Sequence, residues 1–407
     1  MKRAWKKYLM LGMAIYCIGQ DAKANGYKIL CMKDTEATSM GEAFVAQADN
    51  PSAVTFNPSG LPQLRGNQLN IQSTFAEEYT DYTSPLGQKT HNVDELQAVP
   101  SFFFTSDLGT ENVGAGIGIS FPDGLSSEWG EKSFARYVAT YSQLMVADIS
   151  PAVGVRVNDK LMIGAGLDYY YSTVQFDSMV NPAFLGGPSG SPDAQSRLNG
   201  DGSAWGGTLG AIYEITPRNR VAVAYHLPYR IGYDGTYNMP NLMIHSDVGA
   251  TIDYPAVAVV GYAFKPDDKW TFEFDVDWTD WKSVNDIVIH FNTPGMPDVV
   301  QAQDLNDTVA LKLGAQYKYS HNLTLRAGYI YNQNATSETT WRPSLPDSDM
   351  QFLTGGFGYN FGNVTVDTAL QLVYYERRTI ENNINPVIDG TYETIAPCAS
   401  VSATYHF

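Results

Sequence analysis

Serine, histidine and acidic residues could form a hydrolytic centre only if their spacing brought a nucleophile, a base and an orienting group together. The six histidines are scattered along the chain, and no serine or aspartate lies at a spacing that indicates a catalytic triad. His91, His245 and His290 fall in or near polar loops, whereas His226 and His406 fall in alternating segments whose inner face they should share. Nucleotide-binding and zinc-binding spacings do not occur either. The sequence favours a protein that is not an enzyme, and we expect no cofactor and no metal ion.

Binding of a hydrophobic ligand is the chemistry that the remaining candidate residues can supply. One group begins just before the polar segment 122–141 and continues into it: Phe121, Leu125, Trp129 and Phe134. A second group lies in residues 25–65, where no strand pattern occurs: Phe44, Val45, Val54 and Phe56. Each group has a plain structural alternative, because loops pack over one another and a plug must contact its wall. Ligand binding and packing therefore both stay open.

Alternation of charged and apolar residues identifies the elements that must position these groups. Between 270 and 278 the apolar face is Trp270, Phe272, Phe274, Val276 and Trp278, and the other face carries Glu273, Asp275 and Asp277. Successive side chains of a β-strand point to opposite faces, so this period is that of a strand. The same pattern surrounds Lys312, and a lysine facing lipid at the bilayer midplane would cost about 2 to 4 kcal/mol. The charged face must line a lumen, which predicts the strands of a membrane barrel.

The first residues predict export. A basic start, an apolar core over 8–18 and the small residues Ala22 and Ala24 indicate a signal peptide over 1–24, cleaved before Asn25. No later apolar run reaches the roughly twenty residues that a transmembrane helix needs, which excludes a helical membrane protein. Cleavage removes five basic side chains and one acidic one, so the formal net charge moves from −17 to about −21. A nucleic-acid partner does not fit that balance.

The three cysteines do not form a disulfide framework. Cys17 lies in the leader, where the bulky Ile15 and Tyr16 do not fit a lipobox. Cys31 and Cys398 lie near opposite ends of the mature chain in an oxidising compartment, where pairing is permitted but not implied. A disulfide and two free thiols both stay open.

About fourteen segments carry the strand signature, and an even number suits a closed barrel with both chain ends inside. They are 66–82, 95–105, 112–121, 142–157, 161–176, 203–216, 219–235, 252–264, 269–289, 306–319, 322–333, 349–361, 364–376 and 397–407. Long polar loops occupy alternate junctions, at 82–95, 122–141, 177–202, 236–251, 290–306, 334–348 and 377–396. Such an asymmetry is typical of periplasmic turns and extracellular loops. The final Phe407 is similar to the terminal aromatic signal by which outer-membrane barrels are recognised for insertion, so the barrel-assembly machinery is an expected partner.

The predicted fold is all-β: a transmembrane antiparallel β-barrel of about fourteen strands with an N-terminal plug, or hatch, in its lumen. The predicted domains are a signal peptide over 1–24, a hatch over 25–65 and an outer-membrane barrel over 66–407.

Two short motifs refine this prediction. Asn57 and Pro58 are expected to fix a turn of the hatch, because asparagine bonds its own backbone and proline sets φ. Gly114, Gly116 and Gly118 indicate either a kink that opens the wall or ordinary strand glycines.

A set of small and polar residues in the predicted hatch resembles the N-terminal signature of the FadL/TodX family of outer-membrane transporters. It consists of Gly41, Ala43, Ala46, Ala48, Asp49, Ser52, Ala53, Asn57, Pro58, Gly60 and Leu61, with Ser59 in place of the usual alanine. Three further motifs agree with the family: Phe121, Pro122, Gly124, Leu125 and Trp129, then Trp278, Asp280 and Trp281, then Leu345, Pro346 and Asp347. The resemblance runs from about 26 to 407.

The resemblance implies passive transport of hydrophobic small molecules, either long-chain fatty acids or aromatic hydrocarbons. It further implies capture in an extracellular apolar groove, hatch-gated movement and lateral release through the wall. The implied location is the cell outer membrane of a Gram-negative type, in contact with its lipid and lipopolysaccharide. The alternative is a general or cation-preferring porin, against which a hatch of about forty residues argues.

One departure from the family favours an uncharged or aromatic ligand. The family's fatty-acid carriers place basic residues where this chain has Ser172, Thr173, Asp304, Asn306 and Asp307. Lys312 and Arg326 face the lumen by parity and could substitute, although lumen charges usually pair with acids such as Asp275 or Asp367.

Overall fold

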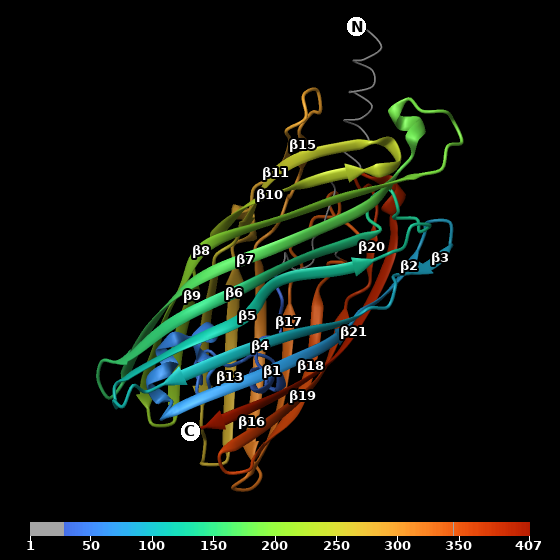
Figure 1. The fold of residues 1–407 in the computed structure, drawn as a ribbon. Coiled ribbons are helices and arrows are strands. Elements are labelled where there is room, and N and C mark those ends of the chain that lie inside the picture. Colours follow the sequence, from blue (N-terminus) through green and yellow to red (C-terminus); the bar gives the residue numbers. More distant parts are fainter. Residues whose placement is uncertain (1–27, 345) are drawn as a thin grey trace.

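The computed structural model describes residues 28–344 and 346–407 (Figure 1). The predicted leader over 1–24, including Cys17, lies outside these residues, and so does Leu345 of the third motif. Within the described part of the chain, no helix has the length and apolar character needed to cross a membrane.

One antiparallel sheet contains the strands, and a few short helices accompany it. The strands are β1 (Asn67–Glu77), β2 (Tyr79–Thr83), β3 (Lys89–His91), β4 (Leu96–Ser106), β5 (Val113–Glu128), β6 (Tyr141–Arg156), β7 (Leu161–Val180), β8 (Ala194–Thr216), β9 (Asn219–His226), β10 (Tyr229–Met239), β11 (Ile244–Tyr254), β12 (Val257–Phe264), β13 (Trp270–Thr279), β14 (Ile287–Phe291), β15 (Val299–Gln301), β16 (Thr308–Lys318), β17 (Leu323–Asn332), β18 (Met350–Asn360), β19 (Val364–Tyr375), β20 (Arg378–Ile380) and β21 (Gly390–His406). The α-helices are α2 (Thr35–Ser39) and α3 (Ala53–Phe56), and the 3₁₀ turns are η1 (Pro58–Gln63), η2 (Pro182–Leu185), η3 (Pro240–Leu242), η4 (Trp281–Ser283) and η5 (Pro386–Ile388).

The sheet closes into a barrel of fourteen wall strands, which confirms the predicted fold class. β1 pairs with β21 from Gln68↔His406 to Ala76↔Cys398, and its other edge pairs with β4. Several wall strands are interrupted: β1 continues into β2, β9 into β10, β11 into β12, β13 into β14 and β19 into β20. The ribbon shows the tilted strands passing around one closed wall (Figure 1).

The polarity of the wall agrees with the predicted alternation. Trp270, Phe272 and Phe274 are exposed on the outer face, whereas Glu273, Asp275 and Asp277 are buried on the inner face. Lys312 and Arg326 are lumen residues paired with acids, as expected: the Lys312 ammonium lies 2.8 Å from Asp277, and Arg326 lies 2.6 Å from Asp367. Because lipid surrounds the wall and the lumen is polar, each strand can only place its apolar face outward and its charged face inward.

Several strands continue into segments predicted as loops. The predicted loop over 236–251 is wrong, because β10 and β11 pair from Tyr229↔Tyr254 to Met239↔Ile244 and leave a connection of only 240–243. Apolar residues of this hairpin, including Tyr237 and Val248, face a buried cluster. β5, β7 and β8 extend likewise, and the last wall strand begins at Gly390 rather than at 397. The strands therefore continue into mostly polar sequence, because their inward-facing apolar side chains still pack against a buried cluster.

The N-terminal segment, defined here as residues 28–64, packs against the inner face of the wall. Wall glycines make room for it: a Cβ on Gly114 would lie 2.3 Å from the Leu61 carbonyl oxygen, and one on Gly164 would lie 2.3 Å from the Pro58 carbonyl carbon. Cys31 of this segment and Cys398 of β21 are free thiols buried in one apolar cluster.

A single methyl group tests how tightly this segment is packed. We expect Gly164→Ala to destabilise the folded protein by about 1 to 3 kcal/mol, because the new Cβ overlaps the backbone of Pro58 and Ser59. Urea unfolding in lipid vesicles, followed by tryptophan fluorescence, measures the change. Gly166→Ala is the matched control on the same strand face, since its Cβ would meet nothing nearer than 3.5 Å. Equal effects of the two substitutions would contradict the packing.

Candidate functional site

A gap in the wall separates the extracellular parts of β4 and β5. The described pairing of these strands runs only from Phe102↔Ile119 to Ser106↔Ala115. β5 then carries a bulge, because Phe121 and Pro122 stand opposite the single residue Ala147 of β6. A bulge bends its strand and increases the twist, so β5 stays on β6 and turns away from β4. We call the opening between 96–101 and 121–128 the wall gap.

Of the two readings of Gly114, Gly116 and Gly118, the position of this bulge favours ordinary strand glycines over a wall kink. All three glycines lie in regularly paired parts of β5, and the register shift falls between Ser120 and Asp123. A Cβ at Gly116 or Gly118 would lie 2.7 Å or 3.3 Å from the side chain of Val54. These glycines therefore make room inside the barrel, and the irregularity comes from the Phe-Pro pair that follows them.

The N-terminal segment lies behind the wall gap. The Ile29 amide donates to the Pro122 carbonyl at 2.8 Å, and Lys28 forms an antiparallel bridge with Asp123. At the far end of the gap, the Val93 amide donates to the Glu128 carbonyl at 2.7 Å and joins the chain before β4 to the end of β5. The chain's own N-terminal residues thus bond to β5 where β4 has left it.

The wall gap opens into a cavity of about 260 Å³, here called the gap cavity. Its apolar lining combines the N-terminal segment with several strands: Ile29, Leu30, Met32, Phe121, Leu125, Leu144, Met350, Phe352, Val373 and Tyr375. Carboxylates of Glu77, Glu78, Glu95, Glu128 and Asp123 also line it. An apolar chamber that reaches through the wall can hold a hydrophobic molecule between lumen and lipid.

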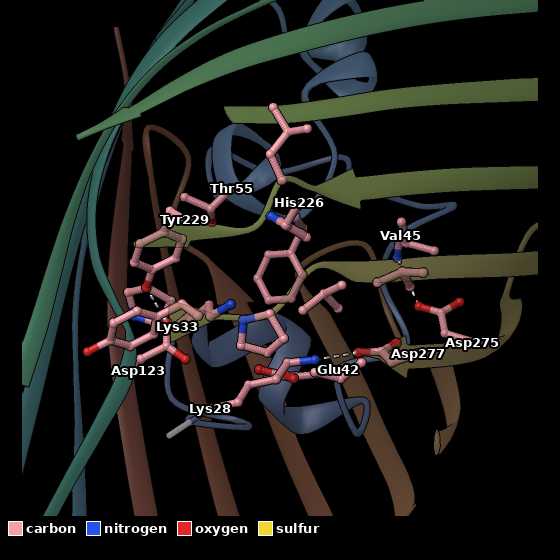
Figure 2. A pocket seen from close by; sticks show the side chains of 18 of the residues that line it. Lys28, Lys33, Glu42, Val45, Thr55, Asp123, His226, Tyr229, Asp275 and Asp277 are labelled. Carbon is pink, nitrogen blue, oxygen red and sulfur yellow. Dashed lines mark hydrogen bonds and ion pairs between the residues drawn. The ribbon is translucent and has the colours of Figure 1, made fainter. Parts of the chain in front are cut away.

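A second cavity of about 80 Å³, the inner cavity, lies deeper in the lumen (Figure 2). Tyr229 lines this cavity and stacks between Tyr170 and Tyr254, with ring centroids 3.7 and 4.5 Å away. The Tyr229 hydroxyl donates to Asp123 at 2.7 Å, and His226 faces the cavity as parity predicts. Asp123 and Lys28 line both cavities, so the two chambers adjoin.

Ion pairs form the polar end of the inner cavity. The Lys28 ammonium lies 3.2 Å from Asp277, and the Lys312 ammonium lies 2.8 Å from Asp277 and 3.2 Å from Glu42. Lys33 projects near these groups and lies over the ring of Phe56 at 5.9 Å (Figure 2). Two of the basic groups at the inner cavity, Lys28 and Lys33, thus come from the N-terminal segment and not from a strand.

Two carboxylates of β13 hold the N-terminal segment by its backbone. Asp275 accepts from the amides of Phe44 and Val45 at 2.9 and 3.1 Å. Glu273 accepts from the next two amides, Ala46 and Gln47, at 2.6 and 3.1 Å. Charge-assisted hydrogen bonds to buried carboxylates are among the strong ones, so this row anchors the segment to the wall.

The structure places the four candidate residues in and beside the segment 122–141 in two different surroundings. Phe121 and Leu125 line the gap cavity. Trp129 and Phe134 line neither cavity and lie in a packed loop cluster, which supports the packing alternative for these two residues. The Trp129 indole donates to the Pro343 carbonyl at 2.7 Å, and Phe134 stacks on Tyr82 at 3.6 Å. Extracellular loops need apolar contacts with one another, and these two rings supply them.

The residues predicted in the hatch are divided in the same way. Val45 and Phe56 line the inner cavity, whereas Phe44 and Val54 are fully buried and pack against Phe56 and the wall glycines. Asn57 caps the start of η1. Its carboxamide oxygen accepts from the Ser59 amide at 3.2 Å, and its carboxamide nitrogen donates to the Val45 carbonyl at 2.9 Å. Pro58 is the first residue of that turn.

Sequence reasoning missed the tyrosine stack and the two lysines of the N-terminal segment. The tyrosines come from β7, β10 and β11, and nothing in their spacing links them. The two lysines could have been found from the sequence. Lys28 and Lys33 are the basic residues of the stretch 25–64, in which every other charged residue is acidic.

Comparison with known proteins agrees with this architecture. The sequence model of the family described as "Outer membrane protein transport protein (OMPP1/FadL/TodX)" matches residues 15–407. The chain belongs to this family. It is therefore an outer-membrane β-barrel of a transport family.

Among curated relatives, the chain is similar to a 47 kDa outer membrane protein of Pasteurella multocida (strain Pm70), at 22% identity over 98% of both chains. It is also similar to the long-chain fatty acid transport protein of Escherichia coli (strain K12), at 21% identity over 92% of this chain and 93% of the relative.

Two solved structures share the fold. A Pseudomonas aeruginosa FadL homologue superposes with a TM-score of 0.81 at 20% identity, covering 94% of this chain and 99% of the other. The P. putida toluene transporter TodX superposes with a TM-score of 0.74 at 18% identity, with the same coverage.

Proposed function

We propose that this protein is a passive transporter that carries hydrophobic small molecules across the outer membrane and catalyses no reaction. The observation that carries the proposal is the gap cavity, an apolar chamber between β4 and β5 that adjoins the inner cavity at Lys28 and Asp123. In this proposal residues 1–24 are the leader, 25–65 form the hatch and 66–407 form the barrel.

The driving force for such transport is burial of apolar surface. A water-filled pore offers a hydrocarbon no favourable free energy along its length. Each CH₂ buried in an apolar chamber gains about 0.8 kcal/mol, so a chain of several carbons is held against water. A ligand that has reached the gap cavity faces lipid through the wall, where its tail stays solvated by hydrocarbon. Lateral release into the membrane therefore needs no aqueous step.

The hatch gates this route in the proposal. Ile29 and Lys28 bond to β5 behind the gap, so a ligand that passes from the inner cavity must displace them. Ligand that binds the displaced arrangement better than the closed one shifts the population towards it. In this proposal the wall contacts outer-membrane lipid and the loops contact lipopolysaccharide. The barrel-assembly machinery recognises the terminal Phe407.

Ligands named for the relatives, a long-chain fatty acid and toluene, are both compatible with an apolar chamber. A general or cation-preferring porin is less well supported, because the N-terminal segment packs against the lumen wall through Gly114, Gly154 and Gly164. Phe121, Leu125, Val45 and Phe56 are the ligand-contacting residues we propose from the predicted set, with Asn57 and Pro58 shaping the hatch turn.

Ligand retention and conductance test the proposal together. The barrel is purified in mild detergent, and native mass spectrometry and lipid extraction identify co-purified hydrophobic molecules. We expect a retained hydrophobic ligand and near-zero single-channel conductance in planar bilayers, because the hatch fills the lumen. An empty protein with steady ionic conductance would favour the porin and overturn the transporter.

A further inference from the structure

Gln371 is a buried polar side chain on the wall of the gap cavity, and its polar neighbours bond it weakly or not at all. It lies on the inner face of β19, lines the gap cavity and is 5% exposed. Neither its carboxamide nitrogen nor its oxygen has a hydrogen-bond partner within residues 28–344 and 346–407. A buried amide that makes no hydrogen bond loses the bonds it had to water, so such a group calls for an explanation.

The neighbours of Gln371 across the ladder do not satisfy it. On β18 it faces Thr354, whose hydroxyl also lacks a partner among the described residues, and on β21 it faces Cys398. The Cys398 thiol contacts the Gln371 amide, but a thiol is only a weak hydrogen-bonding group. Gln371 thus lines the cavity with open donor and acceptor positions, and the buried Thr354 hydroxyl stands beside it on β18.

From Gln371 the ladder leads across Cys398 of β21 and Ala76 of β1 to Gln97 of β4, which lies beside the wall gap. Phe352, Val373 and Tyr375 line the cavity with Gln371, together with Leu30 of the N-terminal segment. Between β19 and β4 lie β21 and β1, so the edge of the gap is roughly 14 Å away along the wall at about 4.8 Å per strand. That geometry suits a ligand with one polar head at Gln371 and an apolar tail directed to the gap.

Charge excludes one class of head group. Three glutamates with partly or fully exposed side chains, Glu77, Glu95 and Glu128, line the cavity. Lys28 is the basic residue of that lining, and its ammonium is already paired with Asp277 at 3.2 Å. Like charges repel more strongly near low-dielectric walls than in water, so a carboxylate head is disfavoured here.

We propose that Gln371, whose amide is flanked by the Thr354 hydroxyl on β18, receives the hydroxyl group of an uncharged amphiphile, such as a long-chain alcohol or an alkylphenol, in the gap cavity. A hydroxyl both donates and accepts, and a carboxamide offers one acceptor and two donors, so a single head group can satisfy both open atoms of Gln371. The site selects such molecules over carboxylates and over plain hydrocarbons. This inference rests on the proposed transport function.

Three probes of equal chain length test the assignment: decan-1-ol, decanoate and decane, offered together at equal concentration to the full mature protein. Native mass spectrometry reads out which is retained. We expect the wild type to retain decan-1-ol about fivefold over decane, the effect of one net hydrogen bond, and to retain decanoate least. Gln371→Leu should abolish the preference for the alcohol while leaving decane retention unchanged. Gln88→Leu, on an exposed turn, is the control and should behave as the wild type.

The isosteric Thr354→Val keeps the test decisive if Gln371→Leu does not give the heat-modifiable electrophoretic shift of a folded barrel. It should weaken the alcohol preference in the same direction. Equal retention of decan-1-ol and decane by the wild type, or an unchanged preference in both variants, would overturn the assignment and leave the transport function standing. Retention of none of the three probes would instead contradict the transport function itself.

Discussion

Replacing Glu273 and Asp275 together by leucine is expected to release the N-terminal segment and to turn a closed barrel into an ion-conducting one. The two carboxylates accept four consecutive backbone amides, from Phe44 to Gln47. Each buried amide that loses its acceptor costs about 1 to 3 kcal/mol, so the segment loses at least about 4 kcal/mol of anchoring. Single-channel recording in planar bilayers should show steady conductance where the wild type shows almost none.

The amide pair Glu273→Gln and Asp275→Asn is the matched control for this result. Asparagine at 275 can keep the one oxygen that accepts from both Phe44 and Val45, whereas glutamine at 273 keeps only one of the two oxygens that accept from Ala46 and Gln47. Three of the four hydrogen bonds can therefore persist without the charge, so this pair should conduct far less than the leucine pair. Protease digestion from the periplasmic side should cut the N-terminal segment of the leucine variant first. Unchanged conductance and protection in the leucine variant would show that the apolar contacts of Val54 and Leu61 hold the segment without the acids.

The wall was predictable from the sequence because lipid imposes a two-residue period on every strand that crosses it. The alternation of Phe272 and Phe274 with Glu273 and Asp275 leaves one tolerable orientation, and the structure has it. Strand ends were not predictable in the same way. β10 and β11 continue through polar sequence because Tyr237 and Val248 meet a buried cluster assembled from other strands.

The candidate site was predictable only where one residue carried its own signal. Pro122 inside an alternating segment marks a bulge, because proline cannot donate to a ladder. The sequence pattern pointed instead to Gly114, Gly116 and Gly118. Their role depends on Val54 and Leu61, which pack against them from another part of the chain. Gln371 gave no signal at all, since a glutamine on a lumen face is ordinary until its neighbours are known to leave it without a partner.

Deleting Pro122 is expected to close the wall gap and to stop the uptake of hydrophobic molecules. The deletion removes the extra residue of the bulge, so Asp123 keeps Val146 as its partner while β5 straightens. The free edge of β4 over 96–101 can then continue its ladder with β5, and the new backbone hydrogen bonds hold the wall shut. Uptake of radiolabelled decan-1-ol by cells should fall to the level of cells that lack the protein.

Pro122→Ala separates closure of the gap from loss of the proline itself. It keeps the residue count of β5, so Phe121 and the alanine still stand opposite Ala147 and the gap stays open. We therefore expect Pro122→Ala to transport and the deletion not to, with both showing the heat-modifiable shift of a folded barrel. If the deletion variant transports as well as the wild type, the ligand leaves through the periplasmic end of the lumen. The hatch would then have to move as a whole, against the row of hydrogen bonds from Glu273 and Asp275 that holds it to β13.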